Sequence, residues 1–212
     1  MTEGRFITFE GGEGAGKSTQ LNRLRDALKQ AGVDVVRTRE PGGSPAAEEI
    51  RTMLVSRETH CWAPETELLL HCAARFEHVA SVVNPALMRG AWVVCDRFHD
   101  STVAYQGYGH GLGTDMVDRL HQMLFGAFQP DLTLILDLPV DVGLERTQVR
   151  GSSEDRYERM AIEFHERLRY GFLKIAEQNS DRCVVLDAAK DEDHVYRDVI
   201  ECVNACFSLA LD

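Results

Sequence analysis

Hydrophobic residues recur along this chain in two alternating patterns. Short, continuous apolar runs predict strands over residues 6–10, 33–36, 91–96, 131–137 and 182–187. Apolar residues at helical spacing predict helices over residues 18–32, 46–55, 65–89, 115–128, 140–149, 157–178 and 192–209. Pro85 is expected to kink or split the third of these helices. Strands that alternate with helices predict one α/β domain, residues 1–212, with a five-stranded parallel sheet flanked by helices on both faces.

Two stretches rich in glycine and polar residues follow predicted strands. Residues 37–45 contain Pro and Gly and are expected to form a loop at the carboxyl end of a strand, where open parallel sheets place their ligands. Residues 101–114 are also expected to lack regular structure, because helical signal resumes only near residue 115. The glycines between residues 107 and 113 resemble a dinucleotide fingerprint, but no strand immediately precedes them, which argues against that reading.

Residues 11–18 match the pattern G-x-x-x-x-G-K-[ST] at every fixed position. Glycines allow successive backbone N–H groups to point at phosphate oxygens, and the helix that follows directs the positive end of its dipole at the same oxygens. Lys17 adds a positive charge, and the Ser18 hydroxyl is suited to Mg²⁺. The motif therefore predicts binding of a nucleoside triphosphate by Gly11, Gly12, Glu13, Gly14, Ala15, Gly16, Lys17, Ser18 and Thr19.

Overall charge and composition narrow the classes of partner. The net charge of −11 argues against a nucleic-acid polymer as a partner. The polar N-terminus does not resemble a signal peptide, and no apolar run reaches the roughly 18 residues of a membrane span. The six cysteines form no C-x-x-C pair. We therefore expect a cytoplasmic protein without a membrane partner.

Other segments discriminate among nucleotide-binding classes. A guanine-nucleotide switch usually carries Asn-Lys-x-Asp after a late strand, and the segments that follow the strands ending at Asp137 and Asp187 do not fit this pattern. A D-x-x-G segment is also missing after Asp96. Asp96 instead ends an apolar strand and is followed by Arg97, which pairs a candidate Mg²⁺ ligand with a phosphate-binding guanidinium.

Three arginines near the end of the chain fit a closing lid. Arg146 and Arg150 are four residues apart and share a helical face, and Arg156 follows a loop that contains Gly151. Cations on such a segment, approximately residues 145–157, would neutralise the phosphates when the lid closes. Spacing alone leaves open a solvated basic face on a surface helix.

The chain resembles bacterial thymidylate kinases in six segments that occur in the order of that family. They are the phosphate loop, Thr-Arg-Glu-Pro-Gly-Gly, Ala-Ala-Arg, Asp-Arg-Phe, Ala-Tyr-Gln-Gly and Arg-Gly to Asp-Arg, at residues 10–19, 38–43, 73–75, 96–98, 104–107 and 150–156. The phosphate loop alone is generic, but the combination is specific and covers the chain from residue 6 to about 190. The resemblance implies a three-layer P-loop kinase with a short arginine-bearing lid, which uses MgATP to convert dTMP to dTDP. It also implies a homodimer.

The resemblance further implies a role for each matched residue. The residues implied in catalysis are Lys17, Glu13, Arg97, Arg146, Arg150 and Arg156, and those implied in metal binding are Ser18 and Asp96. The residues implied in binding the acceptor nucleotide are Arg39, Glu40, Arg51, His71, Arg75, Arg97, Thr102, Tyr105 and Gln106. Arg51 and Arg97 match the clamps on the acceptor phosphate, and Arg75 matches the arginine that reaches the thymine carbonyl.

Two features depart from the family pattern. His71 stands where a phenylalanine commonly stacks on thymine, and an imidazole offers less area and is able to titrate near neutrality. Exposure to solvent or a bond to the backbone is the alternative role for His71. Residues 150–156 also form a longer segment than in close relatives, which leaves the assignment of individual lid arginines open.

Overall fold

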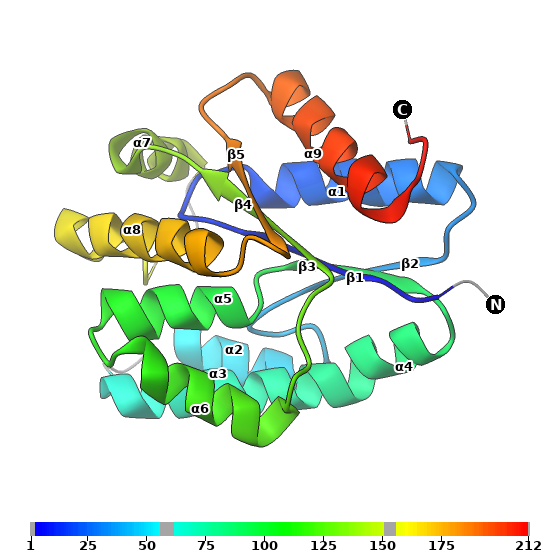
Figure 1. Ribbon diagram of the computed structural model, residues 1–212. Coiled ribbons are helices and arrows are strands. Elements are labelled where there is room, and N and C mark those ends of the chain that lie inside the picture. The colour runs from blue at the N-terminus through cyan, green and yellow to red at the C-terminus, as the bar shows by residue number, and fades with distance from the viewer. Residues whose placement is uncertain (1–2, 56–61, 151–155, 212) are drawn as a thin grey trace.

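Five parallel strands form the centre of the computed structural model, which describes residues 3–55, 62–150 and 156–211, the side chains of residues 149 and 150 excepted. The strands are ordered β2-β3-β1-β4-β5 (Figure 1). Their bounds are Phe6–Glu10 for β1, Val35–Arg39 for β2, Trp92–Asp96 for β3, Leu132–Asp137 for β4 and Cys183–Asp187 for β5. The predicted parallel sheet is confirmed, although β2 extends through residues 37–39, which the sequence assigned to a loop.

Burial on both faces explains why the central strands are continuous apolar runs. Every residue of β1 is buried, and so are the first four residues of β3. Phe9 of β1 is paired with Asp96 of β3, and Glu10 is paired with Ile135 of β4. The carboxyl ends of these strands therefore meet at one edge of the sheet.

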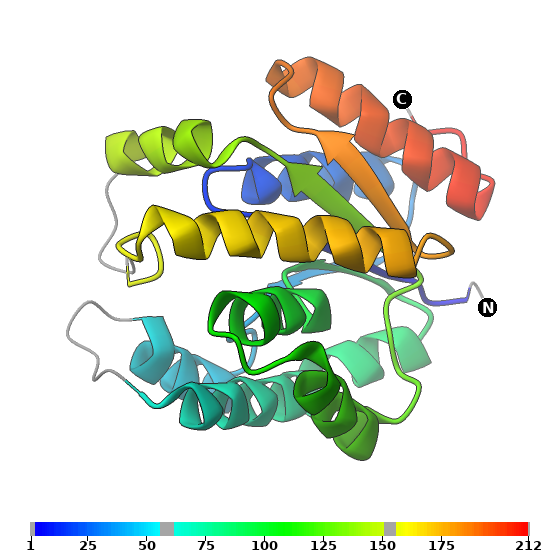
Figure 2. The ribbon, with the colours of Figure 1, turned by 60° about the vertical axis from the view of Figure 1, so that its left-hand side comes forward.

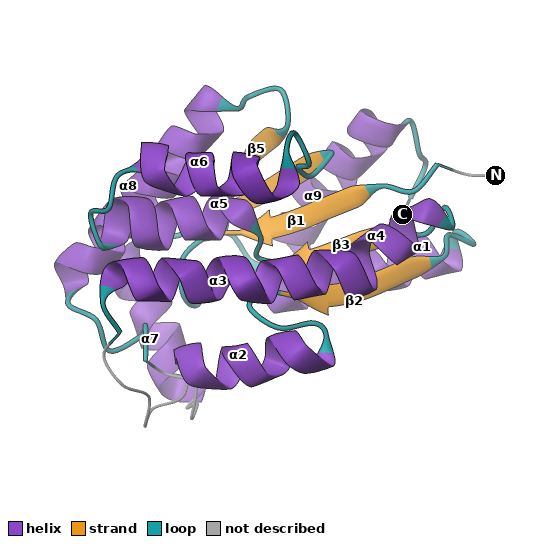
Figure 3. Ribbon diagram, turned by 90° about the horizontal axis from the view of Figure 1, so that it is seen from below, coloured by secondary structure: helices purple, strands orange, loops and turns teal. Residues whose placement is uncertain are grey.

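Helices cover both faces of the sheet. On one face lie α1 (Lys17–Gln30) and α9 (Glu192–Phe207) (Figure 1). These two helices pack against each other and bury leucines and valines on the strands. The other face is covered by a larger group, seen from below in Figure 3. It comprises α2 (Pro45–Val55), α3 (Pro64–His78), α4 (Asn84–Met88), α5 (His99–Thr102), α6 (Thr114–Phe125) and α8 (Ile162–Gln178). Helix α7 (Val140–Arg150) follows β4.

The helix expected over residues 65–89 is divided as Pro85 suggested. A π-helix, η1 (Val79–Val83), separates α3 from α4, and Pro85 lies in the first turn of α4. The change of helix type comes before the proline, whose ring cannot accommodate a helical carbonyl four residues earlier.

The expectation of irregular structure over residues 101–114 is wrong for its first half. Helix α5 continues directly into a second π-helix, η2 (Val103–Gly109), and this segment is mostly buried. Figure 2 shows α8 running beside it. A Cβ atom on Gly109 would meet the ring of Phe164 at 2.6 Å, so this glycine allows two helices to approach closely. Tertiary packing here outweighs the low helix propensity of glycine.

The boundaries of the last helices also differ from expectation. Helix α8 starts at Ile162, because residues 156–159 form turns and not a helix. Helix α9 ends at Phe207. Among the described residues, no helix has the length and apolar character needed to cross a membrane.

Candidate active site

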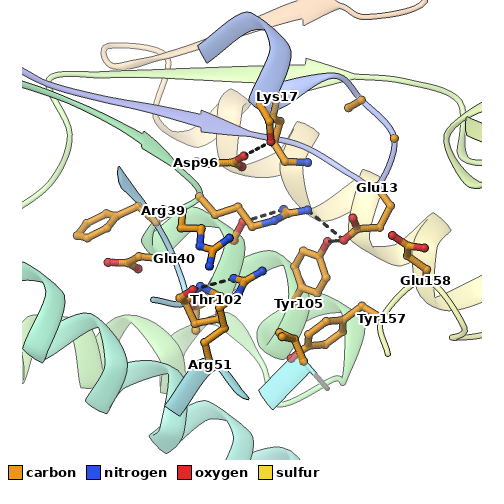
Figure 4. Close-up of a pocket in the computed structure, with 18 of the residues that line it drawn as sticks. Glu13, Lys17, Arg39, Glu40, Arg51, Asp96, Thr102, Tyr105, Tyr157 and Glu158 are labelled. Carbon is orange, nitrogen blue, oxygen red and sulfur yellow. Dashed lines mark hydrogen bonds and ion pairs between the residues drawn. The ribbon is translucent and has the colours of Figure 1, made fainter. Parts of the chain in front are cut away.

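A cavity of about 440 Å³ opens at the carboxyl edge of the sheet, where β1, β2 and β3 end (Figure 4). Most of the residues that the sequence assigned to a nucleotide site line it. They are Glu13, Gly14, Ala15, Gly16, Lys17, Ser18, Thr19, Arg39, Glu40, Arg51, His71, Arg75, Asp96, Arg97, Thr102, Tyr105, Gln106 and Arg146. Gly11 and Gly12, at the start of the loop, line a smaller neighbouring cavity.

The phosphate loop connects β1 to α1 in a conformation that requires glycine. Gly14 has a φ of +70°, and a Cβ atom on it would overlap the carbonyl oxygen of Gly143 in α7. Lys17 begins α1 and donates from Nζ to the carbonyl oxygens of Gly11 at 3.0 Å and Gly12 at 2.7 Å. Burial and the charge of Arg97 lower the pKa of Lys17 to about 8. The loop thus holds a buried cation beside the helix N-terminus.

Ser18 and Asp96 form the candidate metal site. The Ser18 hydroxyl donates to Asp96 Oδ2 at 2.6 Å, although the two residues are 78 positions apart (Figure 4). Nowhere in the described residues do three His, Cys, Asp or Glu side chains gather as a metal cluster. A hydroxyl and one carboxylate suit Mg²⁺, which retains several waters and binds substrate phosphates.

Arg97 is held in an unusual backbone conformation by Glu10. The buried Glu10 carboxyl accepts from the Phe98 amide at 2.7 Å and from Ser101 Oγ at 2.5 Å, across the end of β1. Arg97 has a φ of +71°, in the left-handed region that favours glycine. Its Nη1 donates to the Gly11 carbonyl at 2.9 Å and to Ser101 Oγ at 3.1 Å. The turn therefore directs the guanidinium into the phosphate loop.

Glu13 closes the loop against the same arginine. Its Oε1 accepts from Arg97 Nη2 at 3.0 Å and from the Tyr105 hydroxyl at 2.5 Å (Figure 4). Burial opposes ionisation, but Arg97 and Lys17 lower the pKa of Glu13 to about 2. Glu13 is therefore an ionised acceptor between the two halves of the cavity.

Arg75 is a buried donor on the side of the cavity opposite the phosphate loop. Its Nε donates to Glu40 Oε2 at 2.7 Å, and its Nη2 donates to Thr102 Oγ1 at 2.7 Å and to the Phe98 carbonyl at 3.1 Å. Glu40 also interacts with His78 Nδ1 at 2.8 Å. These partners fix the orientation of the guanidinium and place Thr102 beside it.

His71 lines the cavity next to Tyr157, with its Nε2 3.1 Å from the tyrosine hydroxyl. Burial lowers the pKa of His71 to about 4. The expectation that this ring titrates near neutrality is therefore wrong, because desolvation by the surrounding protein disfavours the charged form of the imidazole. A neutral imidazole at the cavity wall is able to present its face to a ligand.

Arg39 and Arg51 line the remaining part of the acceptor side. Arg39 Nη2 pairs with Glu48 at 2.9 Å, and both side chains are partly exposed. Arg51 Nη1 donates to the Pro41 carbonyl at 2.7 Å. Arg51 comes from α2, as its position in the sequence suggested, whereas Arg39 is the last residue of β2 and not part of the predicted loop.

The lid arginines are placed differently from one another. Arg146 Nη1 lies 3.5 Å from the Gly14 carbonyl and 3.4 Å from the Ala188 carbonyl, so it reaches the phosphate loop. Arg156 forms an ion pair with Glu67 and donates to the Leu54 carbonyl at 3.0 Å, on the opposite side. The Arg150 side chain and residues 151–155 lie outside the described residues. The structure therefore brings Arg146, and not Arg156, to the phosphate loop.

Several residues at the site escaped the sequence analysis. Arg37 lines the cavity two positions before Arg39, and the period of two in a strand could have revealed it. Glu67 contacts cavity residues and lies four positions before His71, on the same face of α3. Tyr157 and Glu158 also line the cavity, but no local pattern distinguishes them.

Comparisons with known proteins point to one family. The family model described as "Thymidylate kinase" matches residues 9–199. The thymidylate kinase of Caulobacter vibrioides is 55% identical over 195 residues, 92% of this chain and 93% of the relative. That of Dinoroseobacter shibae is 49% identical over 201 residues, 94% and 97% of the two chains. The crystal structure of thymidylate kinase from Ehrlichia chaffeensis superposes with a TM-score of 0.77 at 36% identity, and the match covers 95% of this chain and 99% of that one.

Proposed function

This chain belongs to the thymidylate kinase family, and from that premise we propose how its residues carry out the phosphorylation of dTMP to dTDP with ATP. The observation that carries the proposal is a single cavity with two differently built sides, joined by the contact of Arg97 with Glu13. One side offers a phosphate loop for a triphosphate. The other offers Arg75 and Thr102, which suit the edge of a base.

The reaction needs no covalent intermediate with the protein. An oxygen of the dTMP phosphate attacks the γ-phosphorus of ATP, a new P–O bond forms, and the bond to the β-phosphate oxygen breaks, which releases ADP. Lys17 and Arg146 neutralise charge on the donor side, while Arg97 and Arg51 hold the acceptor phosphate. Positioning and charge neutralisation supply the catalysis.

Mg²⁺ belongs to the proposal as the ion that accompanies ATP. Ser18 and Asp96 would hold it, directly or through water, at the edge where their side chains meet. When bound, it neutralises charge on the phosphates of ATP.

Glu13 and Tyr105 serve the sugar of dTMP in this proposal. An ionised Glu13 can accept a hydrogen bond from the 3′-hydroxyl, and the Tyr105 hydroxyl already fixes one of its oxygens. A ribonucleotide would bring its 2′-hydroxyl close to the same side chains. Glu13 and Tyr105 therefore face the part of the sugar at which a deoxyribonucleotide and a ribonucleotide differ.

The single domain over residues 1–212 and its lid, approximately residues 145–157, remain part of the proposal. Arg146 supports it, since its guanidinium lies against the phosphate loop. Arg150 and Arg156 are proposed to join it when the lid closes, which for Arg156 requires release from Glu67. A cytoplasmic location is proposed as well, and the five cysteines that the structure describes, all unpaired, fit a reducing compartment.

An acceptor panel tests the function directly. ADP release is measured in a coupled assay that contains ATP, Mg²⁺ and one acceptor at a time: dTMP, dUMP, dCMP, dGMP or ribothymidine monophosphate. We expect the highest kcat/KM with dTMP. Equal or faster turnover of another nucleotide would contradict the assignment, and ADP release that is independent of any acceptor would identify an ATPase instead.

His71→Phe is expected to tighten dTMP binding about three- to tenfold. A phenyl ring offers a larger apolar face to thymine than a neutral imidazole, and such a contact contributes about 0.5–1.5 kcal/mol. Calorimetric titration with dTMP measures the dissociation constant. Tyr157→Phe is the matched control. It removes the contact between His71 and the tyrosine hydroxyl but leaves the imidazole of His71 in place. Unchanged affinity in His71→Phe would mean that residue 71 does not stack on the base.

We also propose that the protein is a homodimer that pairs through α3 and α6. These helices contact each other, with the rings of Phe76 and Phe125 5.9 Å apart. Their outer faces expose large apolar side chains, namely Leu69, Phe76, Met116, Met123 and Leu124. Neighbouring exposed apolar residues of this size favour burial against a partner.

Met123→Glu is expected to dissociate this dimer. The Met123 side chain is 76% exposed in the single chain, and a carboxylate at this position would have to be buried without a partner in the dimer interface. Sedimentation velocity should show a monomer for this variant and a dimer for the wild type. Leu173→Glu on α8, also at an exposed apolar position, is the control and should remain dimeric. A wild-type monomer at micromolar concentration would contradict the proposal.

A further inference from the structure

Glu67 is a buried carboxylate at the acceptor end of the cavity, and polar side chains from two segments surround it. Its side chain is 1% exposed. Gln106 Nε2 and the Tyr157 hydroxyl donate to its Oε1 at 2.8 and 2.9 Å, and His110 Nε2 lies 3.1 Å from the same oxygen. Arg156 forms an ion pair with its Oε2. Glu67 therefore ties η2 and the turn before α8 to α3.

The charge state of Glu67 follows from these neighbours. Burial opposes ionisation, but His110 and Arg156 lower the pKa of Glu67 well below its usual range. An ionised carboxylate accepts hydrogen bonds and donates none. Whatever faces Glu67 must therefore be a donor.

This constraint sets the orientation of the Gln106 amide. Its amino end must face Glu67, so its Oε1 lies at the opposite end of the amide. Oε1 is buried and receives no hydrogen bond from any residue that the structure describes. Gln106 also lines the cavity, next to Tyr105 and one turn after Thr102. An unpaired buried carbonyl is costly, so a ligand that donates an N–H to it gains affinity.

We propose that Glu67 is a positioning residue that sets the pyrimidine selectivity of the acceptor site. By accepting from Gln106 Nε2, it holds the Gln106 carbonyl ready to accept the N–H at position 3 of thymine. Cytosine has an acceptor nitrogen at that position, so two acceptors would face each other. The inference rests on the proposed dTMP kinase activity and adds a residue that acts through Gln106.

Glu67→Gln tests the proposal with a side chain of nearly the same shape. While the lid is open and the acceptor nucleotide binds, its single carbonyl is expected to stay with Arg156, because a charge-assisted hydrogen bond is stronger than a neutral one. Its amino group would then face Gln106, whose amide must turn over. The Gln106 amino end would point to the cavity, where it suits cytosine and not thymine.

The expected result is a change in selectivity and not only in rate. The ratio of kcat/KM for dTMP to that for dCMP should fall at least about tenfold in Glu67→Gln, mainly through the KM values, the scale expected when buried polar groups lose their match. Glu67→Met, which neither accepts nor donates strongly, frees the amide and should lower the ratio by a smaller factor. It also provides a second variant if Glu67→Gln folds poorly.

Two controls separate positioning from general damage. His110→Leu removes a different neighbour of the same Glu67 oxygen and should leave the ratio within about twofold of wild type, since Gln106 keeps its partner. In a Gln106→Leu background, Glu67→Gln should no longer change the ratio. If Glu67→Gln changes the ratio by the same factor with and without Gln106→Leu, Glu67 does not act through Gln106.

The proposal is overturned if Glu67→Gln lowers kcat/KM for dTMP and dCMP by the same factor, or leaves both unchanged. A wild-type enzyme that does not prefer dTMP in the same assay would instead contradict the proposed function. The two failures are therefore distinguishable within one set of measurements.

Discussion

Arg97→Gly is expected to lower kcat/KM for dTMP by about a hundredfold to a thousandfold, the scale of losing one fixed donor to the reacting group. The guanidinium contacts Glu13, the Gly11 carbonyl and Ser101, so it links the phosphate loop to the acceptor side. Without it, the acceptor phosphate loses a clamp and Glu13 loses its ion pair. Steady-state kinetics with varied dTMP at saturating ATP measures the loss.

The backbone at residue 97 makes glycine the informative replacement. Arg97 has a φ of +71°, which costs a residue with a Cβ roughly 1 kcal/mol and costs glycine almost nothing. Arg97→Ala should therefore be less stable than Arg97→Gly by about that amount in urea unfolding, while both lose activity equally. Activity retained in the glycine variant but lost in the alanine variant would show that the turn, and not the guanidinium, is what matters. Near-normal turnover in both would remove Arg97 from the mechanism.

The positions of the strands along the chain and their parallel arrangement could be predicted, because burial on both faces leaves a plain signal. Residues Trp92 to Cys95 are all buried, and a continuous apolar run of this kind is typical of a parallel strand covered by helices on both faces. The helix over residues 99–109 could not be predicted in the same way. Its glycines resemble loop signals, yet Gly109 makes room for the ring of Phe164, which lies 55 positions later in the chain. The reason for these glycines is a tertiary contact that periodicity does not contain.

The site shows the same division between local and distant information. Ser18 and Asp96 each stand at a strand or loop end whose place in the fold is known, so their contact at 2.6 Å could be expected. Glu67, by contrast, resembles a solvent-facing charge on an amphipathic helix. It is buried because η2 and the turn before α8 cover it. The charge of Arg156 was visible in the sequence, but its partner was not.

The charge of Lys17 should control the use of ATP. Lys17→Ala is expected to lower kcat by about a thousandfold, several kcal/mol of transition-state stabilisation, because the phosphate loop has no other cation in residues 11–19. Its Nζ rests on the carbonyl oxygens of Gly11 and Gly12 and is positioned to move to a phosphate oxygen. Turnover within tenfold of wild type at saturating ATP would contradict this role.

The lowered pKa of Lys17 gives the same assignment a pH dependence with a definite sign. With a pKa of about 8 in the free protein, Lys17 is charged below pH 8 and increasingly neutral above it. Only the charged form attracts phosphates, so kcat/KM for ATP should fall as the pH rises from 8 to 9.5. At saturating ATP the phosphates keep the proton on Lys17, and kcat should change far less. In Lys17→Arg the charge persists over this range, and the alkaline fall in kcat/KM should disappear even if the absolute rate is low. A fall that persists in Lys17→Arg would assign the titration to another group, and a wild-type profile that is flat to pH 9.5 would mean that Lys17 stays charged on the free loop.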